Sequence, residues 1–62
     1  MPVITVEMLK GRTLPQKREI SKKITEIMKE VAKADPNDTF VIIREVEREN
    51  WAWAGTLFSD RK

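Results

Sequence analysis

Two runs of apolar residues flank one segment with helical periodicity. Residues 3–9 are mostly β-branched or apolar, with one charged interruption at Glu7, and predict a strand. Residues 39–46 form a second run, whose near-continuous apolar centre is typical of a strand buried on both faces. Between the two runs, apolar residues at helical spacing form one stripe: Ile20, Ile24, Ile27, Met28 and Val31. The pattern therefore predicts a strand, a helix and a strand in that order.

Local signals set the ends of the predicted helix. Thr13 has the side chain of an N-cap, and Gln16 completes a capping box. Pro15 lies in the first turn, where proline is tolerated. At the other end Asp35 precedes Pro36, and a residue before proline disfavours the helical conformation, so we expect the helix to end there. Since the connections are short, the strands are predicted to be parallel, in an α+β fold built on a β-α-β unit.

The C-terminal segment is predicted to be a short strand or hairpin. Residues 47–50 are polar, and in the segment 51–58 bulky and small side chains alternate before the turn-prone Gly55. A helix on one face of a two-stranded sheet leaves the other face apolar and bare, and two strands are not stable alone. We therefore expect the C-terminal segment to pack on a neighbouring subunit.

Length and composition also favour assembly. The 62 residues are expected to form one domain, residues 1–62, because the chain is too short to build a second hydrophobic core. A chain this short supports only a marginal core, and it has neither Cys nor His to supply disulfides or a zinc site. Hydrophobic residues make up 40% of the chain, which is ample for subunit contacts. A homo-oligomer without metal is the expected state.

Charge excludes several classes of partner. Twelve Lys and Arg stand against ten Asp and Glu, and the two signs are interspersed. Nucleic-acid binders usually concentrate Lys and Arg on one face, so a stacking surface built on Trp51 and Trp53 is disfavoured. The chain has no signal-peptide pattern and no apolar run of about 20 residues. We expect a soluble cytoplasmic protein that binds neither nucleic acid nor membrane.

Pro2 carries the most distinctive chemistry in the chain. Inside a chain the nitrogen of proline belongs to an amide and is not basic. Removal of Met1 makes it a secondary amine, which can accept and return a proton. A strand that begins at residue 3 would hold this terminus in place. Many ordinary proteins begin with Met-Pro and use neither residue, so the dipeptide alone does not establish a function.

In the order of its motifs the chain resembles the 4-oxalocrotonate tautomerase-like proteins of the tautomerase superfamily. The resemblance extends over essentially all 62 residues and rests on the following residues: Pro2, Gly11-Arg12-Thr13, Gln16-Lys17, Val41-Ile42-Ile43-Arg44-Glu45, Trp51 and Gly55. It implies the tautomerase (MIF-like) fold, assembled as a homohexamer that is a trimer of dimers.

The resemblance also implies a cofactor-independent isomerase. Pro2 would act as general base and acid on 2-hydroxydienoates or the enol forms of 2-oxo acids. Arg12 would lower the pKa of that amine as a nearby cation, and its guanidinium would bind a substrate carboxylate in two-pronged fashion. Trp51 lies where the family places an aromatic that lines the pocket and excludes water.

Phe40 is the main departure from the family pattern. The best-studied members carry an arginine at this position, and Phe40 cannot bind a carboxylate. Arg44, on the same face of the strand, is the candidate substitute, and a monoacid or aryl enol is expected to suit the site better than 2-hydroxymuconate. Phe40 and the next residues also resemble one subunit of the trans-3-chloroacrylic acid dehalogenases, but Trp53 and Leu9 replace a catalytic glutamate and a second arginine. The alternatives are a promiscuous hydratase- or dehalogenase-like enzyme and a catalytically silent assembly or binding protein.

Overall fold

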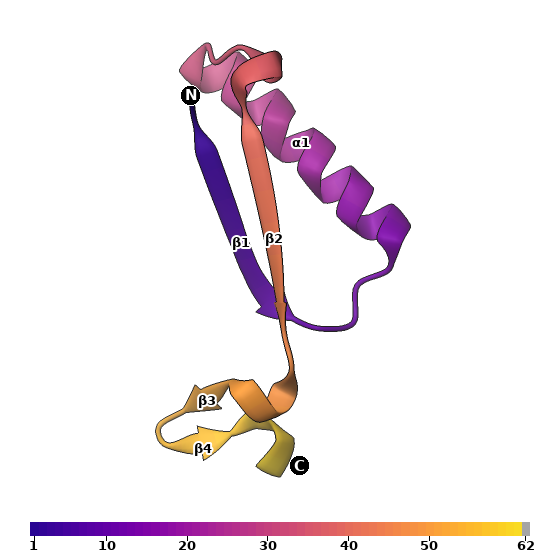
Figure 1. The fold of residues 1–62 in the computed structure, drawn as a ribbon, viewed down its shortest axis with the longest axis vertical. Coiled ribbons are helices and arrows are strands. Elements are labelled where there is room, and N and C mark those ends of the chain that lie inside the picture. The colour runs from indigo at the N-terminus through magenta and orange to yellow at the C-terminus, as the bar shows by residue number, and fades with distance from the viewer. Residues whose placement is uncertain (62) are drawn as a thin grey trace.

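The computed structural model describes residues 1–61 and contains a β-α-β unit followed by a small C-terminal arm (Figure 1). β1 (Val3–Leu9) and β2 (Phe40–Val46) pair in parallel along their whole length. α1 (Leu14–Ala32) connects them and covers one face of the sheet. The predicted β-α-β order and parallel pairing are confirmed, and β2 begins one residue later than the sequence pattern predicted.

α1 begins where the capping signals placed it. The hydroxyl oxygen of Thr13 accepts a hydrogen bond from the backbone N–H of Gln16, at 3.3 Å. The side-chain oxygen of Gln16 accepts in return from the backbone N–H of Thr13, at 2.9 Å. This reciprocal capping box satisfies two N–H groups that have no partner inside the helix. Pro15 lies in the first turn, as predicted.

The other end of α1 differs from the prediction. The helix ends at Ala32, before Asp35 and Pro36, because Lys33 adopts a left-handed conformation with φ 58° and ψ 30°. The backbone N–H groups of Lys33 and Ala34 both donate to the carbonyl of Met28, which satisfies the end of the helix without proline. Pro36 instead begins a short 3-10 helix, η1 (Pro36–Asp38).

The apolar stripe of α1 only partly contacts the sheet. Ile20, Ile24 and Met28 are half-buried, since they lie one turn apart on the face that meets the strands. Ile27 is 56% exposed and Val31 78% exposed, so the predicted apolar stripe extends beyond the part of α1 that the sheet covers. A sheet of two strands is too narrow to cover the whole apolar width of the helix.

One face of the sheet is open in the single protomer. The helix-facing apolar side chains are half-buried: Ile4, Val6, Met8, Val41 and Ile43. On the open face Val3, Phe40 and Ile42 remain 53%, 49% and 41% exposed. The predicted bare face is therefore confirmed, while the burial of residues 39–46 on both faces is not found within one protomer.

The C-terminal arm (residues 48–61) contains the predicted hairpin. Its elements are η2 (Arg48–Asn50), β3 (Ala52–Trp53), β4 (Thr56–Leu57) and η3 (Phe58–Asp60), and β3 and β4 pair antiparallel. Aromatic and guanidinium groups stack inside the arm. The ring centroids of Trp51 and Phe58 are 6.1 Å apart, and the Arg61 guanidinium lies 4.9 Å from the ring centroid of Trp53. Within residues 1–61, no helix is both long enough and apolar enough to cross a membrane.

Candidate functional site

Pro2 lies at the end of the sheet where β1 begins. Its carbonyl accepts a hydrogen bond from the backbone N–H of Phe40, at 3.0 Å, which extends the parallel ladder one residue beyond β1. The ring is half-buried. The α-amino group of Met1 lies 3.5 Å from a carboxylate oxygen of Asp38 in η1. The amino terminus is thus held by both backbone and side-chain contacts.

Arg12 lies at the opposite end of the sheet. It follows β1, whose seven residues separate it from Pro2 by about 20 Å at the usual rise of a strand. Its side chain is exposed and makes no ion pair or hydrogen bond with any other side chain in the described part of the chain. The two residues predicted to perform catalysis are therefore not brought together within one protomer.

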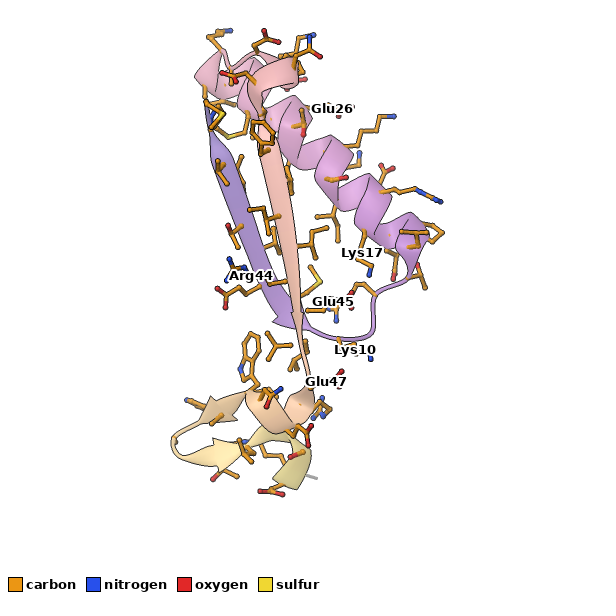
Figure 2. The ribbon with its side chains drawn as sticks, in the orientation of Figure 1. Lys10, Lys17, Glu26, Arg44, Glu45 and Glu47 are labelled. Atoms are coloured by element: carbon orange, nitrogen blue, oxygen red, sulfur yellow. The ribbon has the colours of Figure 1, made fainter. Side chains whose placement is uncertain are left out.

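The predicted substrate-binding residues are also spread along the sheet. Phe40 pairs with Val3, next to Pro2. Arg44 lies opposite Glu7 in the register, on the face away from α1 (Figure 2). Trp51 lies beyond the far end of the sheet, where it lines a hollow of about 260 Å³ together with Glu7, Val46, Asn50 and Ala52. Of the predicted set, only Phe40 shares its end of the sheet with Pro2.

The turn that carries Arg12 is held to the end of β2 by the two residues before Arg12 and to α1 by the residue after it. The backbone N–H of Lys10 donates to the carbonyl of Val46, at 2.9 Å, and its ammonium lies 3.1 Å from a carboxylate oxygen of Glu47. The backbone N–H of Gly11 donates to the side chain of Glu45, at 3.3 Å. Thr13 follows with its capping box. Arg12 therefore projects from a fixed backbone, although its side chain has no partner among residues 1–61.

Glu45 links this turn to the helix. Its second carboxylate oxygen accepts a short hydrogen bond from the ammonium of Lys17, in the first turns of α1 (Figure 2). Together with the N–H of Gly11, this bond lowers the pKa of the Glu45 carboxyl below its ordinary value, because both donors favour the charged form. Sequence reasoning gave Glu45 no role beyond its place in a motif. The available signal was its strand position, which shares the helix-facing side with Val41 and Ile43.

A larger hollow, of about 450 Å³, lies between α1, η1 and β2. It is lined by polar helix residues and by two apolar residues: Ser21, Lys22, Thr25, Glu26, Lys29, Pro36 and Val41. It contains none of the predicted site residues. Within residues 1–61, no group of three acidic side chains is placed to hold a metal ion.

Comparison with known proteins gives a consistent result. Residues 2–61 match the family model described as tautomerase enzyme. The chain is 43% identical over 60 residues to the 2-hydroxymuconate tautomerase of Bacillus subtilis, covering 97% of each chain. It superposes on the crystal structure of a 4-oxalocrotonate tautomerase homologue with a TM-score of 0.93 and 37% identity, covering 100% of this chain and 98% of the other.

A third similarity concerns the fold alone. The chain superposes on a protein from Chloroflexus aurantiacus described as a heterohexamer 4-oxalocrotonate tautomerase, with a TM-score of 0.90, 22% identity and complete coverage of both chains. The family match over residues 2–61 agrees with the parallel β-α-β unit and the C-terminal hairpin seen here. The chain therefore belongs to the tautomerase family and is an isomerase.

Proposed function

We propose that the chain is a cofactor-independent keto–enol tautomerase in which the nitrogen of Pro2 transfers the proton. Removal of Met1 frees that nitrogen as a neutral secondary amine. The amine takes the proton of a 2-hydroxyl group while the double bonds shift, and it returns a proton at carbon to give the 2-oxo product. The proton removed from oxygen is balanced by the proton returned at carbon, and the substrate is neither oxidised nor reduced, so the reaction needs no cofactor.

The position of Pro2 is the observation that carries this proposal. The nitrogen of proline is an amide inside a chain and a basic secondary amine at a chain start, and here Pro2 directly precedes β1. The hydrogen bond from Phe40 to its carbonyl holds the ring at the edge of the sheet. An amine held in a half-buried place keeps its orientation toward a substrate, which general acid–base catalysis requires.

We propose that Arg12 reaches the same site from another copy of the chain. Its guanidinium is exposed and unpaired among the described side chains, as a group that binds a substrate carboxylate must be. The length of β1 prevents it from reaching Pro2 of its own protomer. Trp51, at the same far end of the sheet, would enter the site in the same way and shield it from water.

The site accordingly requires a homo-oligomer, for which we propose a hexamer formed as a trimer of dimers. The single protomer exposes 5043 Å², against about 4,100 Å² expected for a folded chain of this size. None of the described residues is fully buried. The open face with Val3, Phe40 and Ile42 and the protruding arm supply the surfaces that neighbouring copies would cover.

We infer that the substrate is a 2-hydroxydienoate or the enol of a 2-oxo acid with one carboxylate. Arg12 supplies one two-pronged carboxylate site. Phe40, next to Pro2, supplies an apolar wall instead of a second cation. Arg44 lies further along the open face, opposite Glu7 in the register of the two strands. The name of the Bacillus subtilis relative makes 2-hydroxymuconate the dicarboxylate to compare with monoacids.

The test is an ultraviolet assay of enol-to-keto conversion with protein whose amino-terminal residue is verified by intact mass. We expect Pro2→Ala to lower kcat by about 10²–10⁴-fold, because a primary amine with different basicity replaces the positioned ring nitrogen. Pro15→Ala, which removes a proline from the exposed first turn of α1, is the matched control and is expected to retain activity.

Normal turnover by Pro2→Ala contradicts the proposed role of Pro2. Absence of turnover by the verified wild type on every enol of the panel favours the catalytically silent assembly protein instead.

A further inference from the structure

Gly11, directly before Arg12, has a backbone that depends on an outside partner. Its φ of 142° lies in a region that residues with a side chain rarely adopt. Because glycine has no Cβ, many backbone conformations are open to it, and its own sterics do not select this one. Its N–H donates to a carboxylate oxygen of Glu45, on β2, at 3.3 Å. The contact joins residues 34 positions apart. The hydrogen bond from Gly11 to Glu45 of β2 therefore helps to determine the direction in which the side chain of Arg12 points.

Glu45 is itself held in place by α1. Lys17 donates to its other oxygen, so each carboxylate oxygen has one partner and the side chain has one orientation (Figure 2). The side chains of Glu45 and Lys17 are only 23% and 29% exposed. In the other ion pair on α1, the side chains of Glu19 and Lys23 are 59% and 67% exposed, and the Lys23 ammonium lies 3.5 Å from a Glu19 carboxylate oxygen. Glu45 and Lys17 thus form the most enclosed ion pair among residues 1–61.

We propose that Glu45 is a positioning residue for Arg12, which acts through the backbone of Gly11 and is oriented by Lys17. This inference rests on the proposed function of Arg12 in carboxylate binding. Glu45 never touches the substrate. It sets the path of the turn, so that the guanidinium of Arg12 meets the carboxylate without reorganising on binding.

The charge of Glu45 is essential to this role. A carboxylate accepts from both Lys17 and Gly11, whereas a carboxamide accepts through one oxygen and offers an N–H₂ group to the ammonium, which is not an acceptor. Glu45→Gln therefore keeps at most one of the two bonds and loses the fixed orientation. Lys17→Gln leaves the acceptor for Gly11 intact and removes only the ion pair, so its effect is expected to be smaller.

The kinetic signature follows from the way Arg12 acts. The carboxylate that Arg12 binds keeps its charge throughout the reaction, so Arg12 binds it in the ground state as well as in the transition state, and a misplaced Arg12 is expected to raise KM more than it lowers kcat. We expect Glu45→Gln to raise KM about five- to tenfold, in the range for a weakened charged hydrogen bond. Glu19→Gln, the same chemical change in the exposed pair, is expected to leave both constants unchanged.

A double-mutant cycle separates positioning from general loss of structure. In an Arg12→Ala background, Glu45→Gln is expected to have no further effect on KM, because the group that it positions is absent. An equal increase of KM in both backgrounds overturns the inference. A normal KM in Glu45→Gln, when Arg12→Ala has a raised KM, overturns it too and leaves the proposed function intact. A normal KM in Arg12→Ala overturns the assignment of Arg12 and the positioning role together.

A measurement without substrate tests the contact itself. The amide proton of Gly11 is expected to change its chemical shift as Glu45 ionises, with a midpoint below the ordinary glutamate value of 4.5. Glu45→Gln is expected to abolish this transition, and Glu19→Gln to preserve it. A Gly11 amide that does not respond between neutral and acidic pH overturns the inference, whatever the enzymatic rates.

Discussion

Glu45 is a carboxylate on the helix side of β2, where its neighbours make the charged form the stable one. Lys17 on α1 and the N–H of Gly11 donate to it, and Lys10 adds a third, more distant attraction, so its pKa is lowered. A lowered pKa stabilises the fold above about pH 4.5, and this contribution is lost as the pH falls through the folded value. We therefore expect the difference in Tm between wild type and Glu45→Gln to be largest near pH 7 and to shrink as the pH falls below 4.5. Thermal unfolding at fixed protein concentration measures it, and a difference independent of pH contradicts the assignment.

Single residues were predictable from the sequence only where their chemistry follows from chain position. Pro2 was recognisable because it follows Met1 and precedes a strand, and Thr13 and Gln16 because a capping box is a local pattern. The role of Glu45 was not predictable, because its partner Lys17 is 28 positions away in the sequence and its contact with the turn after β1 depends on the register of β1 and β2. The exposure of Ile27 and Val31 was also hidden, since helical periodicity does not reveal how wide the covering sheet is.

The hairpin of the arm is an element whose turn is only half suited to its conformation. Ala54 and Gly55 both have positive φ, 53° and 80°, as a two-residue type I′ turn requires. Alanine pays roughly 1–2 kcal/mol there, whereas asparagine adopts this conformation readily. We expect Ala54→Asn to raise Tm and Gly55→Ala to lower it. A Cβ at Gly55 meets no atom within 4 Å, so the loss is due to the backbone alone. Opposite signs for either variant in thermal unfolding contradict this assignment of the turn.

The ends of helices are predicted more accurately where neighbouring side chains determine them than where the backbone conformation of a single residue does. The start of α1 follows from side chains within four residues of each other, and the structure confirms it. The sequence analysis placed the end of α1 too late, because Pro36 disfavours the helical conformation at Asp35 but does not require the helix to continue up to it. The left-handed Lys33 and its bonds to Met28 end the helix earlier, and lysine carries no signal for that conformation.

At the scale of the whole molecule, the protomer is extended rather than compact. Its principal extents are 42 × 24 × 14 Å, and the amino terminus and the arm lie at opposite ends (Figure 1). Its Cα radius of gyration is 14.8 Å, against about 11 Å expected for a compact chain of this length. Composition and length predict that such a chain needs neighbours, and the pattern of strands and helix indicates the bare sheet face and the C-terminal segment as the surfaces that face them. The open sheet face and the arm are the surfaces that we propose neighbouring copies cover, and the length of β1 separates Pro2 from Arg12.

Ile42 lies at the centre of the open face and provides a test of assembly that leaves every proposed site residue in place. It pairs with Thr5 in the middle of β1 and is 41% exposed. If another copy covers this face, Ile42→Asp buries an unpaired carboxylate, which costs several kcal/mol and shifts the protein to smaller species. We expect sedimentation velocity to show that shift, together with loss of turnover, because an isolated protomer cannot bring Arg12 to Pro2. Ile42→Val, which removes one carbon and adds no charge, is expected to retain both assembly and activity. If the Ile42→Asp protein keeps the wild-type size and turnover, no other copy covers the open face. If it is monomeric and keeps full turnover, one protomer contains the complete site.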